Sequence, residues 1–253
     1  GDYANGMRVG GVDGYRWGLY GVRPISAPPR LGFAWDALGK GRTVIRGGVG
    51  VFLDRSRQLL NSGTANNPPV DYAPTLYYGD LNTFANSSGA IGPTTSSFVF
   101  PAERVKLPSV ASFSFGVQQQ LPSATLLDVS YVGSASSHLL QSRNLNPIPM
   151  FSRFDPKNAD PTLVGKPLPD DFLRPYRGLG ALNANEFAAS ANYHSLQTRI
   201  ERRFTRGLGF GVAYTWSKAL GVASTYNESS TSYFDFRKWE YGPLSFDRSH
   251  VFT

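Results

Sequence analysis

The sequence of 253 residues contains no cysteine, only two methionines, and few charged residues, which make up 17% of the chain. The absence of cysteine excludes disulfide bridges and thiolate metal sites. No stretch approaches the roughly 18 consecutive apolar residues of a membrane-spanning helix, because Arg, Asp, Pro or Gly interrupts every apolar run. The low charge, together with 27 glycines and 18 prolines, argues against a coiled coil and a helical bundle. The composition instead favours a protein of β-strands and loops.

The sequence does contain a repeated alternation of apolar and polar residues, which is the period of a β-strand with one apolar face. The clearest case runs from Leu208 to Lys218, where every second residue is large and apolar: Leu208, Phe210, Val212, Tyr214 and Trp216. This period predicts seven strands, at residues 30–36, 43–54, 109–121, 124–133, 193–204, 208–218 and 246–253. We expect residues 1–29 to be an irregular lead-in and residues 30–253 to form one β-domain.

The connections between these strands alternate between short and long. Residues 37–42, 122–124 and 205–207 are short enough for hairpin turns. Residues 55–108, 134–192 and 219–245 are long stretches rich in Asn, Ser, Gly, Pro and Tyr. Barrels of the outer membrane have short periplasmic turns at one end and long extracellular loops at the other. The sequence therefore predicts an all-β fold, an antiparallel meander of transmembrane β-barrel strands that forms a partial barrel.

Aromatic residues are found where two interfacial girdles of such a barrel are expected. Trp35 and Phe204 lie beside short turns, whereas a second group lies near the long connections: Phe52, Tyr131, Tyr193, Tyr214 and Trp216. A soluble β-sandwich also has alternating strands and aromatic core residues, and it remains the alternative. The sandwich does not account for the unequal connection lengths or for polar faces so rich in Gly, Ser and Thr.

Charge and motifs exclude several classes of function. The net charge is +7, yet the long connections mix both signs, so a nucleic-acid groove is not predicted. Basic residues gather at the short turns, where they either are simply solvated or contact anionic lipid headgroups or an interior domain: Lys40, Arg42, Arg202, Arg203 and Arg206. His138, His194 and His250 stand apart from one another without metal-ligand spacing, and no nucleophile elbow is present. We therefore expect no enzyme, cofactor or metal.

Two sets of residues are the candidates for function. Five charged residues fall on the polar faces of their strands, which in a barrel means the lumen: Arg46, Asp128, Arg199, Glu201 and Arg203. They form either a salt-bridge ladder that stiffens the wall or a lining that meets a plug or a solute. Six aromatic residues in the long connections either stack on a ligand or pack the loops together: Tyr72, Tyr77, Tyr78, Tyr176, Tyr233 and Trp239.

Four groups of short motifs resemble the barrel of Oar-like TonB-dependent receptors. The first is PRLGFAWD at 29–36 with GRTVIRGG at 41–48 and FLDR at 52–55. The second is DVSYVGS at 128–134 with HL at 138–139 and RNLN at 143–146. The third is NYHSLQ at 192–197 with ERRF at 201–204, RGL at 206–208 and AYTWSK at 213–218, and the fourth is FDRSHVF at 246–252. The matches run from about residue 29 to the chain end.

The resemblance implies a receptor of the bacterial outer membrane that binds a ligand with extracellular loops and imports it past a plug, powered through TonB. Barrels of this kind have about 22 strands. Seven predicted strands are fewer than the minimum of eight for a closed bacterial barrel, so we expect a fragment from the middle of the barrel. Its implied partners are outer-membrane lipid, the rest of the barrel, the plug, an unknown ligand and, through segments absent here, TonB. The alternative function is a β-rich surface adhesion or assembly protein without transport activity.

Overall fold

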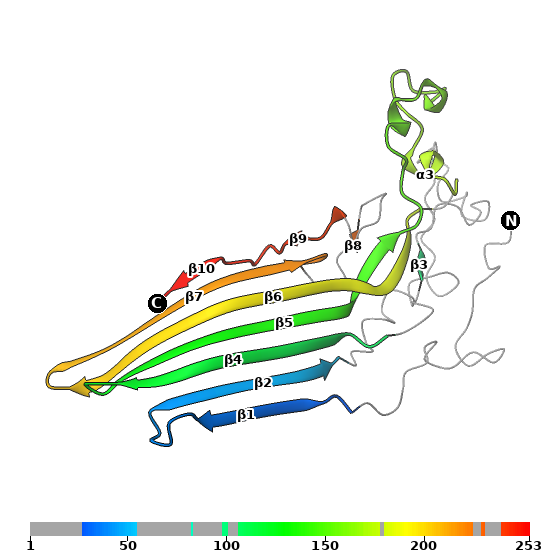
Figure 1. Ribbon diagram of the computed structural model, residues 1–253. Helices are drawn as coiled ribbons and strands as arrows, with labels where there is room; N and C mark the ends of the chain where they lie inside the picture. The colour runs from blue at the N-terminus through cyan, green and yellow to red at the C-terminus, as the bar shows by residue number, and fades with distance from the viewer. Residues whose placement is uncertain are drawn as a thin grey trace.

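The structure, a computed structural model, describes residues 27–54, 82, 98–100, 106–177, 180–224, 229–230 and 239–253. Most of them form one sheet whose main strands are antiparallel and follow each other in chain order (Figure 1). These strands are β1 (Arg30–Asp36), β2 (Thr43–Leu53), β4 (Ser109–Leu121), β5 (Thr125–Asn144), β6 (Leu182–Thr205), β7 (Leu208–Gly221) and β10 (His250–Phe252). The fold is thus the predicted antiparallel meander, and the described strands do not close into a barrel.

Shorter elements lie beside the main strands. β3 (Phe98–Phe100) runs parallel to β6, β8 (Ser229–Ser230) runs parallel to β5, and β9 (Gly242–Pro243) pairs with β7. The connection between β5 and β6 contains η2 (Ser152–Phe154), η3 (Pro156–Asn158) and α3 (Asp170–Leu173). None of the helices in the described part of the chain is long and apolar enough to cross a membrane.

All three short turns lie at one end of the sheet, and α3 lies beyond the other end (Figure 1). Arg206 and Gly207 both have positive φ angles, of 51° and 79°, as a two-residue turn between right-twisted strands requires. In the turn between β1 and β2, the carboxylate of Asp36 accepts a hydrogen bond from the N–H of Gly41 at 2.7 Å. Both turns are stabilised by their own residues, so these hairpins can form without contacts from other parts of the chain.

Strand register divides the sheet into two chemically different faces, because residues directly opposite each other point to the same side. One row of partners is Phe33, Gly47, Phe115, Tyr131, Leu196 and Trp216, which lie opposite one another from β1 to β7. This side, here called the apolar face, carries exposed large side chains from Leu31 to Phe252. The opposite side, here called the polar face, carries mainly Gly, Ser, Thr, Gln and charged residues.

The edges of the apolar face run obliquely across the strands. On β7 the large apolar residues extend from Leu208 to Trp216, whereas on β2 they extend from Ile45 to Leu53. In register, Trp216 is level with Gly47, so both edges shift by six residues over the four strand spacings from β7 to β2. Six residues cover about 20 Å along a strand, and four spacings cover about 19 Å. The strands therefore cross the apolar band at a tilt of about 45°, in the range of membrane barrels.

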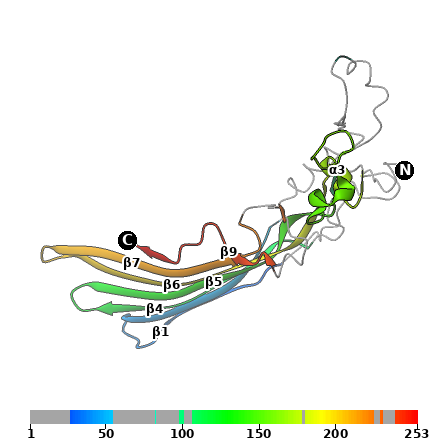
Figure 2. The same cartoon turned by 90° about the horizontal axis from the view of Figure 1, so that it is seen from above.

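Several element bounds differ from those predicted. β5 continues past residue 133 to Asn144, and β6 begins at Leu182 rather than at residue 193, so the connection is 145–181 instead of 134–192. These outer halves bend away from the rest of the sheet (Figure 2). At the C-terminal end, β10 comprises only His250–Phe252, because the Asp247 carboxylate replaces a ladder bond by accepting from the N–H of Ala219. Residues 1–26 of the predicted lead-in at 1–29 lie outside the described residues.

Candidate functional site

The charged residues predicted on the polar face form two ion pairs near the short turns. Arg46 pairs with Asp128, and Arg199 pairs with Glu201 at 2.7 Å. Asp128 and Arg199 are also directly opposite each other in the register of β5 and β6, so the four side chains form a ladder from β2 to β6. Arg203 lies on the same face by alternation and forms no ion pair with a described residue. The structure thus brings together four of the five predicted residues.

Gly116 makes this ladder possible, because β4 lies between the partners Arg46 and Asp128. The register places Gly116 between Arg46 and Ser130, where a side chain would stand beneath the arginine. A Cβ atom at residue 116 would lie 2.9 Å from Cβ of Ser130 and 3.2 Å from the carbonyl oxygen of Val129. The glycine therefore leaves a gap over which the Arg46 side chain crosses to the next strand but one.

The described part of the loop region provides only two of the six predicted aromatic residues. Tyr176 lies in the connection between β5 and β6 and Trp239 lies just before β9, and both are exposed. Tyr72, Tyr77, Tyr78 and Tyr233 lie outside the described residues. Their role as ligand contacts stays a prediction.

The base of the connection between β5 and β6 is held by Asn146, which the sequence marks only as the last residue of the RNLN motif, without a predicted role. Its side chain is fully buried and brackets Tyr176, accepting from the N–H of Tyr176 at 2.9 Å and donating to its carbonyl oxygen at 3.1 Å. It also donates to the carbonyl oxygen of Gly180 at 3.0 Å. The preceding Asn144 caps the N–H groups of Asn146 and Leu182. The spacing of Asn144 and Asn146 is the sequence feature that could have indicated this turn. Asn and Asp side chains commonly accept a hydrogen bond from the backbone N–H two residues further along the chain.

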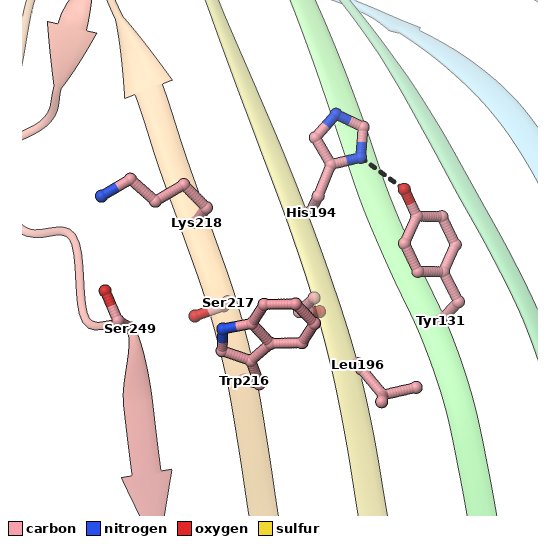
Figure 3. A pocket seen from close by; sticks show the side chains of 8 residues that line it. Tyr131, His194, Leu196, Trp216, Ser217, Lys218 and Ser249 are labelled. Atoms are coloured by element: carbon pink, nitrogen blue, oxygen red, sulfur yellow. Dashed lines mark hydrogen bonds between the residues drawn. The ribbon is translucent and has the colours of Figure 1, made fainter.

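A hollow of about 500 Å³ opens on the apolar face of the sheet, near the end with the long connections. Figure 3 shows the side chains that line it. Leu196 and Trp216 contribute apolar surface, and both side chains belong to the apolar face. Tyr131, His194, Lys218 and Ser249 add polar groups, and Ser195 and Ser217 complete the lining. The hollow is thus apolar toward the centre of the band and polar toward its edge.

Two tyrosine–histidine pairs border this region. The hydroxyl of Tyr131 lies 2.6 Å from Nδ1 of His194, and that of Tyr214 lies 2.8 Å from Nδ1 of His250. The two ring planes of each pair are inclined by 26° and 20°, with centroids 6.0 Å and 6.2 Å apart. Figure 3 shows the pair of Tyr131 and His194. These contacts satisfy polar atoms on a face that is otherwise apolar, as aromatic residues at an interface require. Neither pair was predicted from the sequence, because partners on neighbouring strands are distant along the chain.

The predicted aromatic girdle near the long connections needs one correction. Tyr193 and Phe52 lie on the polar face, because their register partners Ser134 and Val110 lie there. The Phe52 ring is covered by the guanidinium of Arg30 at 4.4 Å, a cation–π contact instead of a lipid contact. Neighbouring residues of a strand point to opposite faces, so Phe52 and Tyr193 point away from the apolar face that carries Val51 and His194. Proximity to a strand end does not establish which face a residue occupies.

The charged residues at the edge of the hollow form an ion pair. Nζ of Lys218 lies 2.6 Å from Oδ2 of Asp247, and the side chain of Asp247 is largely buried. The hydrogen bond from Lys218 lowers the pKa of Asp247 below its ordinary value, and the bond from the N–H of Ala219 lowers it further. Arg248 donates to the carbonyl oxygen of Asp247 at 2.9 Å. The carboxylate therefore stays ionised at neutral pH, in contact with the ammonium of Lys218.

The described residues contain no group of three or more His, Asp or Glu side chains that would hold a metal ion. Asp155 and Asp160 instead accept hydrogen bonds from the backbone of their own turns, at Lys157 and Thr162.

The register, the tilt and the exposed apolar face define a segment of a transmembrane β-sheet. The chain belongs to the family described as outer membrane beta barrel domain, whose model matches residues 2–253. It is accordingly a protein of the bacterial outer membrane. The crystal structure of the outer membrane transporter YddB from Escherichia coli is similar, with a TM-score of 0.49 and 11% identity over 80% of this chain. This chain covers 21% of that transporter, and no curated protein matches the sequence.

Proposed function

We propose that this chain forms part of the barrel wall of a TonB-dependent outer-membrane receptor of the Oar-like type. The observation that carries the proposal is the separation of the two faces, with an ion-pair ladder and small polar residues on one side and exposed apolar residues on the other. A wall between lipid and a polar lumen requires this separation. The family match and the four motif groups support the same assignment.

In this proposal the end with the short turns faces the periplasm, and the long connections face outward. The ladder from Arg46 to Glu201, together with Arg203, lines the lumen near the periplasmic end, where it meets the plug. Tyr176, Trp239 and the other loop aromatics contact the ligand. The open edges at β1 and β10 pair with further strands of the barrel, because unpaired backbone groups are not tolerated in a membrane. Uptake needs binding and passage, and no covalent chemistry.

The first test is the intact mass of the native polypeptide, taken from outer-membrane extract by mass spectrometry. A mass several-fold above 27.6 kDa is expected, because a plug and further strands must be added. The second test is formaldehyde crosslinking in cells, followed by identification of proteins bound to the native polypeptide. TonB in the crosslinked product supports the proposal. A polypeptide of about 27.6 kDa without a crosslink to TonB refutes it and favours the adhesion or assembly protein.

A further inference from the structure

The hollow on the apolar face lies at the edge of the band of apolar residues, the position at which a membrane barrel meets lipid headgroups. Trp216 is the last large aromatic residue of the apolar band on β7, and Lys218 is the next residue on the same face. Lys218 is directly opposite His194, and Trp216 is directly opposite Leu196. The hollow therefore spans the boundary between the apolar band and the charged edge, and any molecule in it has one apolar and one polar part.

The polar part of the lining consists mainly of hydrogen-bond donors. Nδ1 of His194 is engaged by the hydroxyl of Tyr131, and when that hydroxyl donates, the neutral imidazole carries its proton on Nε2. The ammonium of Lys218 has three protons, of which the contact with Asp247 uses one. The indole N–H of Trp216 and the hydroxyl of Ser249 add two more donors. With Arg248 beside Asp247, the edge has two cations and one carboxylate.

We propose that this hollow is a binding site for a phosphorylated glycolipid of the outer leaflet of the outer membrane. Its phosphate is bound by Lys218, its sugar ring stacks on Trp216, and its acyl chains follow the apolar face past Leu196. The donors at the polar edge of this mainly apolar lining match a phosphate, whose oxygens accept hydrogen bonds. Exposed aromatic rings match the C–H face of a sugar. The assignment to the outer leaflet rests on the orientation in the proposed function.

The test uses the native full-length protein in detergent, titrated with diphosphorylated lipid A and followed by native mass spectrometry. Lys218→Gln removes one charge-assisted contact and is expected to weaken binding about tenfold. Arg206→Asn is the matched control, because it removes one positive charge at the opposite end of the same hairpin and retains a residue suited to a positive φ. The control is expected to bind as tightly as the unchanged protein.

Two further probes test the two parts of the ligand. Dephosphorylated lipid A is expected to bind more weakly, with Lys218→Gln making little further difference. Phosphatidylglycerol, which has a phosphate but no sugar, is expected to bind more weakly than lipid A and to be insensitive to Trp216→Leu. Equal binding by Lys218→Gln and Arg206→Asn overturns the proposal, and so does equal affinity for phosphatidylglycerol. Heat-modifiable gel migration identifies variants that fold, so loss of lipid binding by a folded variant is distinguished from failure of the transport proposal.

Discussion

Gly116 gives the sharpest test of the polar wall, since replacing it with alanine adds only one methyl group. The new Cβ atom would lie 2.9 Å from Cβ of Ser130 and 3.2 Å from the carbonyl oxygen of Val129, which belongs to the backbone of the neighbouring strand. Overpacking of this kind costs about 1–3 kcal/mol. The crossing of Arg46 to Asp128 would also be disturbed, but this pair is partly exposed and contributes less than about 1 kcal/mol. We therefore expect a loss of about 2 kcal/mol.

The assay is reversible urea unfolding of the native protein in lipid vesicles, followed by tryptophan fluorescence. Gly211→Ala is the matched control, because Gly211 is also on the polar face, opposite Glu201, and a Cβ atom there meets nothing within 4 Å. Both substitutions restrict the unfolded chain to the same extent, so the difference between them isolates the close contact. A second comparison introduces Asp128→Asn into the protein with Gly116 and into the Gly116→Ala variant. The loss of stability caused by Asp128→Asn should be larger in the protein with Gly116. If Gly116→Ala is as stable as Gly211→Ala, a side chain at residue 116 does not clash with β5.

Four further predictions follow from the same geometry. Single cysteines can be introduced without background because the chain has none, and Ser114→Cys should react with a water-soluble maleimide whereas Phe115→Cys, on the lipid side, should not; equal labelling would contradict the assignment of the faces. The isolated 253-residue chain should elute as aggregates in size-exclusion chromatography without detergent, since its apolar face and strand edges are open, and a sharp monomer would refute the membrane assignment. Because the pKa of Asp247 is lowered on folding, its stabilising effect is present above about pH 4 and is lost as the pH falls through the lowered value; urea midpoints measured across this range should depend less on pH in Asp247→Asn, and an unchanged dependence would count against the pair with Lys218. Asn146→Ala removes three hydrogen bonds to the backbone of Tyr176 and Gly180, so protease should cleave residues 145–181 faster in intact cells, while an unchanged cleavage rate would show that this connection is held by other contacts.

The sequence predicted the parts of the fold that adjoin an apolar medium. On β7 the alternation from Leu208 to Trp216 has one large residue at every second position, so both the strand and its outward face could be predicted. The short turn at Arg206 and Gly207 was predictable from its length for the same hairpin. The ladder was predictable only as a set of residues on one side. Its pairing of Arg46 with Asp128 depends on the order of β2, β4 and β5, which alternation does not specify.

The hollow could not be predicted because its lining comes from β5, β6, β7 and the residue before β10. Tyr131 and His194 are 63 residues apart, and neither belongs to a motif that predicts their contact. Asp247, the partner of Lys218, was assigned to a strand, whereas its carboxylate in fact replaces a strand hydrogen bond.

Strand length explains why alternation does not predict the outer halves of β5 and β6. At a tilt of about 45°, an apolar band of about 25 Å is crossed by roughly 35 Å of strand, or about 11 residues. β2 has 11 residues and β4 has 13, so each is little longer than one crossing, whereas β5 has 20 and β6 has 24. The part of β6 that was predicted, 193–204, is about one crossing long, and 182–192 extends beyond the band. Beyond the band neither face of the strand contacts lipid, so one face no longer has to be apolar. The backbones of β5 and β6 nevertheless continue to pair.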